Sequence, residues 1–200
     1  MANFDIAIVE IFKNEGGYQN HPSDRGNYNS LGENVGTNYG ISAKTYEGYI
    51  NRPPTADDMR NMTISTAKTI YKRSYWDAYK LGSINDQFIA SHILDLFVNH
   101  SPKAAAEIAQ KAIVKTPPFF TKVDGIFGPK TIATINQIAS NGKASELNTN
   151  IVNERKLYYN SLGNLSFLDG WTNRAHSWGE YANILVPVIP TIAMFFFCHT

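Results

Sequence analysis

The chain has 200 residues, 43% of them hydrophobic and 18% charged, so it is long enough to bury a hydrophobic core and is typical of a globular protein. Its net charge of +1, from 18 Lys and Arg against 17 Asp and Glu, argues against a dedicated nucleic-acid-binding protein. A single cysteine, Cys198, excludes an intrachain disulfide and a zinc site of the cysteine type.

The first predicted element is an amphipathic helix that starts after Asn3, a suitable N-cap residue. Glu15 lies eleven positions after Phe4 and returns to the same face, because a helix turns about 100° per residue. Burial on this apolar face and the negative end of the helix dipole are both expected to raise the pKa of the carboxyl group. The alternative is a solvated glutamate at a frayed helix end. The apolar face consists of Phe4, Ala7, Ile8, Ile11 and Phe12, and Gly16-Gly17 ends the helix.

The next segment, residues 18–41, is rich in Asn, Gly, Ser and Asp and predicts an irregular loop or a small sheet. Helical patterns return after Ser42, and the helix that follows Asn85-Asp86 is apolar nearly all round, so we expect it to be the buried central helix. No long linker divides the chain, which predicts one all-α domain. The expected helix boundaries are Thr55 with Asp58 as a capping box, Thr63, Asn85 or Asp86, Ser101-Pro102, Gly128-Pro129, Asn141-Gly142, and two last helices near 146–162 and 171–181.

The sequences at both ends of the chain are informative about where the protein is located in the cell. Asp5 and Glu10 interrupt the N-terminal apolar pattern, so we expect no secretory signal peptide. Seventeen uncharged residues from Ala182 to Cys198 are at the short edge of a membrane span and contain two prolines. This tail has three interpretations: a buried terminal segment, a weak membrane anchor, or a docking strip for a partner.

Six blocks of sequence, in order, resemble the glycoside hydrolase family 108 muramidases, which belong among the lysozyme-like folds. Some members of this family are phage endolysins and others are called secretion activators. The resemblance implies a lysozyme-like catalytic part over residues 1–110, a helical peptidoglycan-binding part over 111–181 and an apolar tail over 182–200. The matching blocks are residues 15–26, 36–41, 70–77, 94–102, 123–131 and 170–174.

The resemblance also implies the catalytic residues. Glu15 matches the catalytic glutamate of the family, and glycoside hydrolysis needs such a carboxylic acid to protonate the leaving oxygen. In similar phage-type lysozymes an Asp and a Thr help to place the attacking water, and Asp24 and Thr37 occupy the matching positions. Twelve residues separate these two, more than is usual in the family. We expect Thr37 to keep its place because Asn38-Tyr39-Gly40-Ile41 follows it intact.

Other residues are candidates for substrate binding. Tyr18, Tyr39 and Trp76 are suited to stacking on sugar rings and equally to packing in the core. Asp95 and Asn99 lie four residues apart on one helical face, where a structural role is at least as well supported as sugar contact. The five histidines show no metal-ligand spacing, and we assign no metal and no cofactor.

The predicted function is hydrolysis of the β-1,4 bond between N-acetylmuramic acid and N-acetylglucosamine in bacterial peptidoglycan, at the cell wall or in the periplasm. The alternative is a non-catalytic or weakly active protein that binds peptidoglycan or assists secretion, which the long loop before Thr37 favours and the intact Glu15 disfavours. A transglycosylase on the same scaffold needs no carboxylate to place water, so Asp24 disfavours it.

Overall fold

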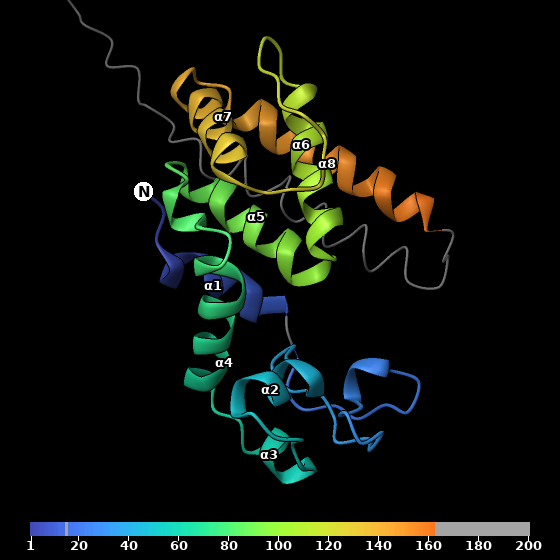
Figure 1. Ribbon diagram of the computed structural model, residues 1–200. Coiled ribbons are helices and arrows are strands. Elements are labelled where there is room, and N and C mark those ends of the chain that lie inside the picture. Colours follow the sequence, from blue (N-terminus) through green and yellow to red (C-terminus); the bar gives the residue numbers. More distant parts are fainter. Residues whose placement is uncertain (15, 163–200) are drawn as a thin grey trace, which may run out of the picture.

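The computed structural model describes residues 1–14 and 16–162, which are mainly helical, as the sequence predicts (Figure 1). Glu15 and residues 163–200 lie outside the described residues. The helix expected near 171–181 and the apolar tail therefore lie outside them as well.

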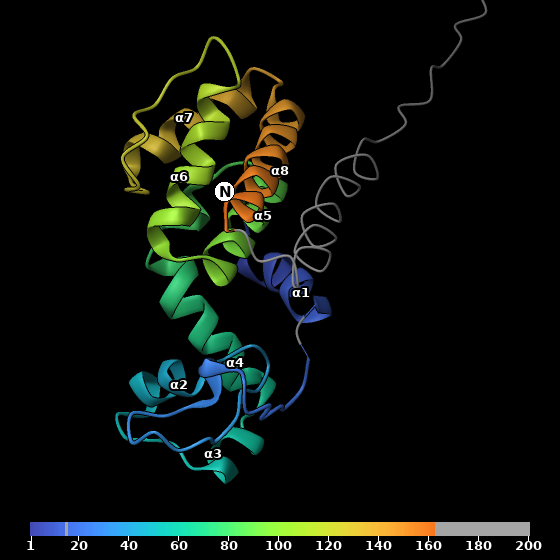
Figure 2. The same ribbon diagram turned by 90° about the vertical axis from the view of Figure 1, so that its right-hand side faces the viewer.

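The upper part of the molecule is built around α5 (Gln87–Asn99). α1 (Phe4–Asn14) packs against α5, and α6 (Pro102–Val114) packs against α5 and α8 (Ala144–Ser161), as Figure 2 shows. α7 (Pro129–Ser140) contacts both α6 and α8. Every side chain of α5 from Ile89 to Phe97 is buried, which confirms the prediction of a central buried helix.

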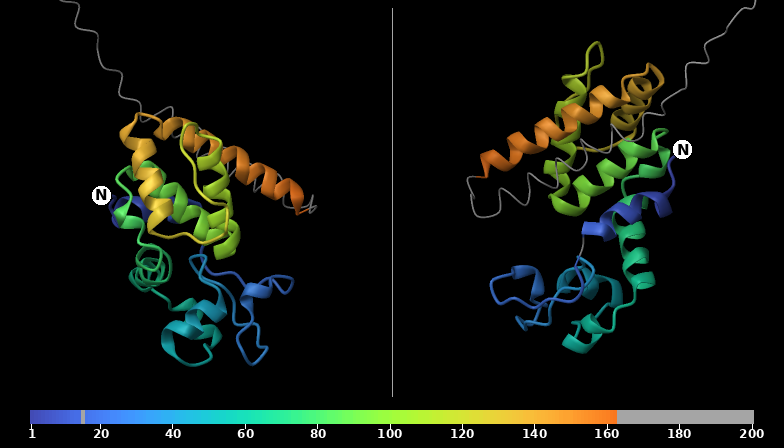
Figure 3. Two further views of the ribbon diagram at one scale, coloured as in Figure 1. Left: turned by 45° about the horizontal axis from the view of Figure 1, so that its top comes forward. Right: turned by 180° about the vertical axis from the view of Figure 1, so that it is seen from behind.

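The lower part holds the polar loop of residues 16–41 together with α2 (Ala43–Ile50) and α3 (Ala56–Arg60) (Figure 3). α4 (Ile64–Tyr71) runs from this part to the upper one, and a π-helical turn over Lys72–Asp77 continues it. Within residues 16–41 the backbone makes only isolated antiparallel bridges, between Gln19 and Thr37, Tyr28 and Asn34, and Asn38 and Ile41. The expected irregular loop is confirmed.

Side-chain caps fix the starts of most helices where the sequence predicts them. Thr55 and Asp58 form the complete capping box of α3. Thr63, Asp86 and Ser101 each accept a hydrogen bond from a backbone N–H in the first turn of α4, α5 and α6. These local bonds position each helix independently of its packing.

One hydrophobic cluster runs through both parts of the chain, from Phe4 in α1 to Ile151 in α8. Its members include Ile41 at the end of the loop, Met59 in α3 and Ile93 in α5, so the loop and the helices share a core. Over residues 1–14 and 16–162, none of the helices combines the length and the apolar content that crossing a membrane requires.

Candidate active site

The polar loop reaches the C-terminal end of α1 through aromatic contacts. The ring of Phe12, in the last turn of α1, lies with its centroid 6.1 Å from that of Tyr39 and 5.8 Å from that of Tyr71. Tyr39 is two residues after Thr37, so the segment that carries Thr37 lies beside the end of α1. Glu15, the expected general acid, follows Asn14 directly in the chain and is outside the described residues.

A cluster of polar side chains joins the two sides of the loop. Gln19 and Thr37 exchange two backbone hydrogen bonds, of 2.9 and 2.8 Å. The amide groups of Gln19 and Asn27 also bond to each other, at 3.0 and 3.1 Å. Asn27 is fully buried, and its Nδ2 donates in addition to the carbonyl of His21, at 2.9 Å. This buried amide therefore fixes the geometry of the loop.

The twelve residues between Asp24 and Thr37 fold back on themselves. Tyr28 pairs with Asn34 across the tip, and the N–H groups of Val35 and Gly36 both donate to the carbonyl of Asn27, at 2.9 and 3.1 Å. Residues 35 and 36 therefore lie beside Asn27, although seven residues separate Val35 from it in the sequence. Thr37 lies next to Asn27 as a result, and its hydroxyl donates to Asn27 Oδ1 at 2.5 Å.

Asp24 is anchored to the same cluster. Its Oδ2 accepts from Gln19 Nε2 at 2.7 Å, and its Oδ1 accepts from the N–H of Gly26 at 2.8 Å. A Cβ on Gly26 would lie 3.1 Å from Asp24 Oδ1 and 3.7 Å from Thr37 Oγ1, so the carboxylate and the hydroxyl flank the same side of this glycine. The structure therefore brings Asp24 and Thr37 together.

This arrangement suits the orientation of a water molecule. The proton of the Thr37 hydroxyl is held by Asn27, which leaves the oxygen lone pairs available to accept from a second donor. Each oxygen of Asp24 accepts one hydrogen bond within the loop and has capacity for another. A water between them can donate one proton to each side chain and point its oxygen lone pair outward.

Family comparisons agree with the motifs. Residues 8–101 match the family model described as glycosyl hydrolase 108. The chain carries a glycosyl hydrolase 108 domain. Residues 104–176 match a second model, described as a predicted peptidoglycan domain. Together the two matches indicate a peptidoglycan-related protein of the glycoside hydrolase class.

The solved structure of SagA from Brucella abortus is similar over nearly the whole chain. It has 26% sequence identity and a TM-score of 0.71, and the match covers 90% of this chain and 94% of that one. None of the curated proteins matches this sequence.

Two tyrosines of the glycosyl hydrolase 108 domain border the loop cluster. Tyr18 is half-buried; its hydroxyl donates to the carbonyl of Val35 at 3.3 Å, and the Arg60 guanidinium lies 4.9 Å from its ring centroid. Tyr39 is also half-buried, and its carbonyl accepts from the Tyr71 hydroxyl at 2.9 Å. Both residues are therefore partly exposed.

Trp76 lies in the core of the glycosyl hydrolase 108 domain. It is 5% exposed, and its ring packs edge-on against Phe4 with the centroids 5.7 Å apart. This position favours the packing role over stacking on a sugar. Gly82 lies against its indole, where an added Cβ would be 3.2 Å from Nε1.

Asp95 makes a fully buried ion pair with Arg155 of the peptidoglycan domain, at 2.6 Å. Asn99 is exposed, and its Nδ2 donates to the carbonyl of Asp95 at 2.7 Å. These contacts favour the structural role for both residues. Sequence reasoning missed Arg155, although Ile151 and Tyr159 on the same helical face indicate that its position is buried.

The titratable group most affected by burial is His92. Its ring is fully buried, with Nδ1 2.7 Å from Asn148 Oδ1. Burial and the nearby Arg155 lower the pKa of His92 to about 3. In the described part of the chain, no three His, Cys, Asp or Glu side chains lie close enough together to hold a metal ion.

Proposed function

We propose that this protein is an N-acetylmuramidase that hydrolyses the β-1,4 bond between N-acetylmuramic acid and N-acetylglucosamine in peptidoglycan. Glu15 acts as the general acid and protonates the leaving oxygen. Asp24, with Thr37, orients the attacking water and stabilises the positive charge that develops on the sugar. The cell wall is the site of action.

The observation that carries this proposal is the joining of Asp24 and Thr37 through Asn27. Three hydrogen bonds link them, from Gln19 to Asp24, from Gln19 to Asn27 and from Thr37 to Asn27. A binding protein without turnover has no need of a carboxylate and a hydroxyl held in one hydrogen-bonded cluster. The loop that carries Thr37 contacts the last turn of α1 through Tyr39 and Phe12, and Glu15 follows this helix directly in the sequence.

Tyr18 and Tyr39 are the sugar-contacting candidates that we retain. Both rings are partly exposed on the loop that carries Asp24 and Thr37. Aromatic rings offer a flat apolar surface with a polar edge, which suits the faces of pyranose rings.

The test is the release of soluble fragments from purified peptidoglycan by the wild type and by Asp24→Asn and Thr37→Val. Asp24→Asn removes the charge without changing the shape, and we expect the rate to fall about 100-fold. Thr37→Val removes the hydroxyl, and we expect a fall of about tenfold. Asp77→Asn is the matched control, because Asp77 is 55% exposed and pairs with Lys72 in the π-helical turn. Equal rates for Asp24→Asn and the control would contradict the proposal.

A further inference from the structure

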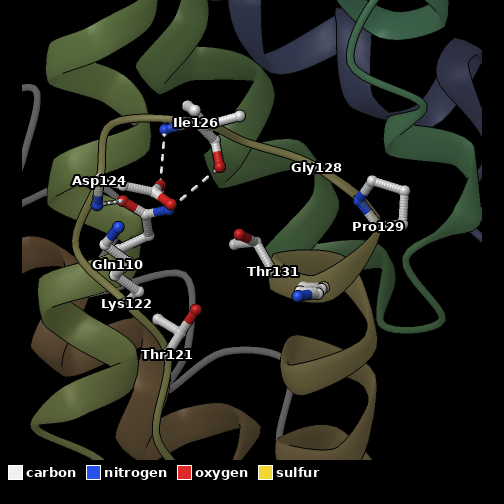
Figure 4. A pocket seen from close by; sticks show the side chains of 9 residues that line it. Gln110, Thr121, Lys122, Asp124, Ile126, Gly128, Pro129 and Thr131 are labelled. Carbon is white, nitrogen blue, oxygen red and sulfur yellow. Dashed lines mark hydrogen bonds between the residues drawn. The ribbon is translucent and has the colours of Figure 1, made fainter.

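A hollow of about 430 Å³ lies in the part of the chain that matches the predicted peptidoglycan domain. It is bordered by α6, by residues 121–128 and by the first turn of α7 (Figure 4). None of the expected catalytic or sugar-binding residues lines it. Its lining combines charged side chains, a buried hydroxyl and an apolar rim.

Gln110 of α6 holds one wall of this hollow in place. Its side chain is 1% exposed, and Nε2 donates to Asp124 Oδ1 at 2.8 Å and to the carbonyl of Ile126 at 3.0 Å. Its Oε1 accepts from the N–H groups of Asp124 and Gly125, at 3.1 and 3.0 Å. The hydrogen bond from Gln110 lowers the pKa of Asp124, so this carboxyl group is ionised at neutral pH. The wall is therefore rigid and carries a negative charge.

The opposite wall is the N-terminus of α7, a helix of twelve residues. Pro129 occupies its first position and no side chain caps it. The N–H groups of Lys130 and Thr131 in this turn have no partner within the helix, and the helix dipole makes this end positive. An N-terminus of this kind attracts an anion.

Thr131 provides a second, independent indication of a ligand. Its side chain is only 2% exposed, and its hydroxyl makes no hydrogen bond with the described residues. Figure 4 shows this hydroxyl directed into the hollow, on the side of Asp124. The hydroxyl can therefore donate a hydrogen bond to a ligand in the hollow.

The charges favour a carboxylate over a more highly charged anion. Lys122 and Lys130 line the hollow with Asp124, so the three side chains carry a net charge of +1. Ile126, 70% exposed at the rim, offers an apolar surface beside them. In intact peptidoglycan the carboxylates belong to the peptide stems, because the lactyl carboxyl of the sugar is consumed in the amide bond to the peptide.

We infer that this hollow binds a free carboxylate of a peptidoglycan peptide stem. The N–H groups of Lys130 and Thr131 and the Thr131 hydroxyl donate to the carboxylate, and the Lys130 ammonium neutralises it. Ile126 contacts an apolar part of the stem, such as an alanine methyl. The inference rests on the proposed function in that it takes peptidoglycan as the partner, and it assigns the peptide, rather than the glycan, to this half of the chain.

The experiment is calorimetric titration of the full chain with the soluble tetrapeptide L-Ala-γ-D-Glu-diaminopimelyl-D-Ala, and with the same peptide after amidation of its carboxylates. We expect the free peptide to bind, and the amidated peptide and Thr131→Val each to show about tenfold weaker binding, which corresponds to the loss of a charge-assisted hydrogen bond. Lys130→Gln is expected to weaken binding similarly and to reduce its dependence on salt.

Thr134→Val is the matched control. Thr134 is on the same helix, but its hydroxyl donates to the carbonyl of Lys130 at 3.0 Å and does not line the hollow. The inference is overturned if Thr131→Val, folded by circular dichroism, binds the free peptide as the wild type and the control do. Equal binding of the amidated peptide overturns it too, as does inorganic phosphate binding as tightly as the peptide.

Failure of the inference is separable from failure of the proposed function. Glu15→Gln is expected to bind the tetrapeptide as the wild type does while releasing no glycan fragments. If Thr131→Val loses peptide binding but still cleaves glycan, the result supports the peptide site independently of the muramidase proposal. A wild type that binds the peptide and cleaves no glycan contradicts the muramidase and leaves the peptide site supported.

Discussion

Gly26 lies where the carboxylate of Asp24 and the hydroxyl of Thr37 approach each other. It occupies a short 3-10 turn over Arg25–Asn27, and its N–H donates to Asp24. Its φ is not in the left-handed region, so the backbone accepts any L-residue. Glycine is therefore required here because a larger residue would crowd the side chains of Asp24 and Thr37.

Gly26→Ala is expected to lower kcat by about tenfold or more with little change in KM, because the methyl group lies beside Asp24 Oδ1 and Thr37 Oγ1, where we propose that the attacking water binds. Its effect on the free energy of unfolding should stay within about 1 kcal/mol. Steady-state kinetics on soluble glycan fragments and thermal unfolding measure both. Gly48→Ala in α2 is the control, since an added Cβ there meets nothing within 4 Å. Unchanged kcat in Gly26→Ala would exclude a water at this point.

His92 makes stability depend on pH. In the unfolded chain its pKa is near 6.5, and in the fold burial lowers it to about 3. Between these values the unfolded chain binds a proton that the folded protein does not, so stability falls as the pH falls from about 6.5 toward 3. The slope contributed by this group is at most about 1.4 kcal/mol per pH unit.

The measurement is the free energy of unfolding by urea between pH 7 and pH 4, in the wild type and in His92→Gln. The variant is expected to lose less stability over this range, whatever its stability at pH 7. Parallel curves for the two proteins would show that His92 is protonated at the same pH in both states.

Among the elements, the helices that are bounded by their own caps could be predicted from sequence. Thr55 with Asp58, Thr63, Asp86 and Ser101 are all local signals, because each capping bond joins residues three positions apart. The π-helical turn at Lys72–Asp77 has no such signal and was not predicted. It extends α4 and brings the Trp76 ring against Phe4.

Thr55→Ala is expected to reduce the free energy of unfolding by about 1 kcal/mol, because it removes one half of the capping box of α3. Chemical denaturation measures this change. Thr69→Ala serves for comparison, since Thr69 is exposed in α4 and its hydroxyl donates to the Ser65 carbonyl of the same helix. Alanine is a better helix former there, so that variant should be at least as stable as the wild type. A Thr55 variant equal to the wild type would contradict a stabilising role for the cap.

For the whole molecule, the family resemblance and the helical pattern predicted the fold. The spacing of residues in the sequence predicted only some of the residues of the candidate site. Asp24 and Thr37 could be picked out by matching, but Gln19 and Asn27, which connect them, lie in a segment without periodicity. Such contacts form when the loop folds back on itself, and they produce no repeating pattern in the sequence. The pairing of Asp95 with Arg155 joins residues 60 positions apart and could not be predicted for the same reason.

That ion pair connects the two family domains, since Asp95 lies in residues 8–101 and Arg155 in residues 104–176. Asp95→Ala is expected to reduce the free energy of unfolding by about 3–5 kcal/mol, because it leaves a buried guanidinium without its carboxylate. The double variant Asp95→Leu with Arg155→Met should recover much of this loss. Denaturant unfolding of the wild type, the double variant and its two component single variants, Asp95→Leu and Arg155→Met, tests the coupling. A loss of stability in the double variant equal to the sum of the two single losses would contradict it.

The most direct test of the muramidase is mass spectrometry of peptidoglycan digested by the wild type and by Glu15→Gln. We expect the wild type to release fragments with a reducing N-acetylmuramic acid end, and folded Glu15→Gln to release none. Anhydromuramic ends would contradict hydrolysis and indicate a transglycosylase. Intact wild type that releases nothing from several wall types would contradict the assignment of Glu15 as a general acid and leave a protein that only binds peptidoglycan.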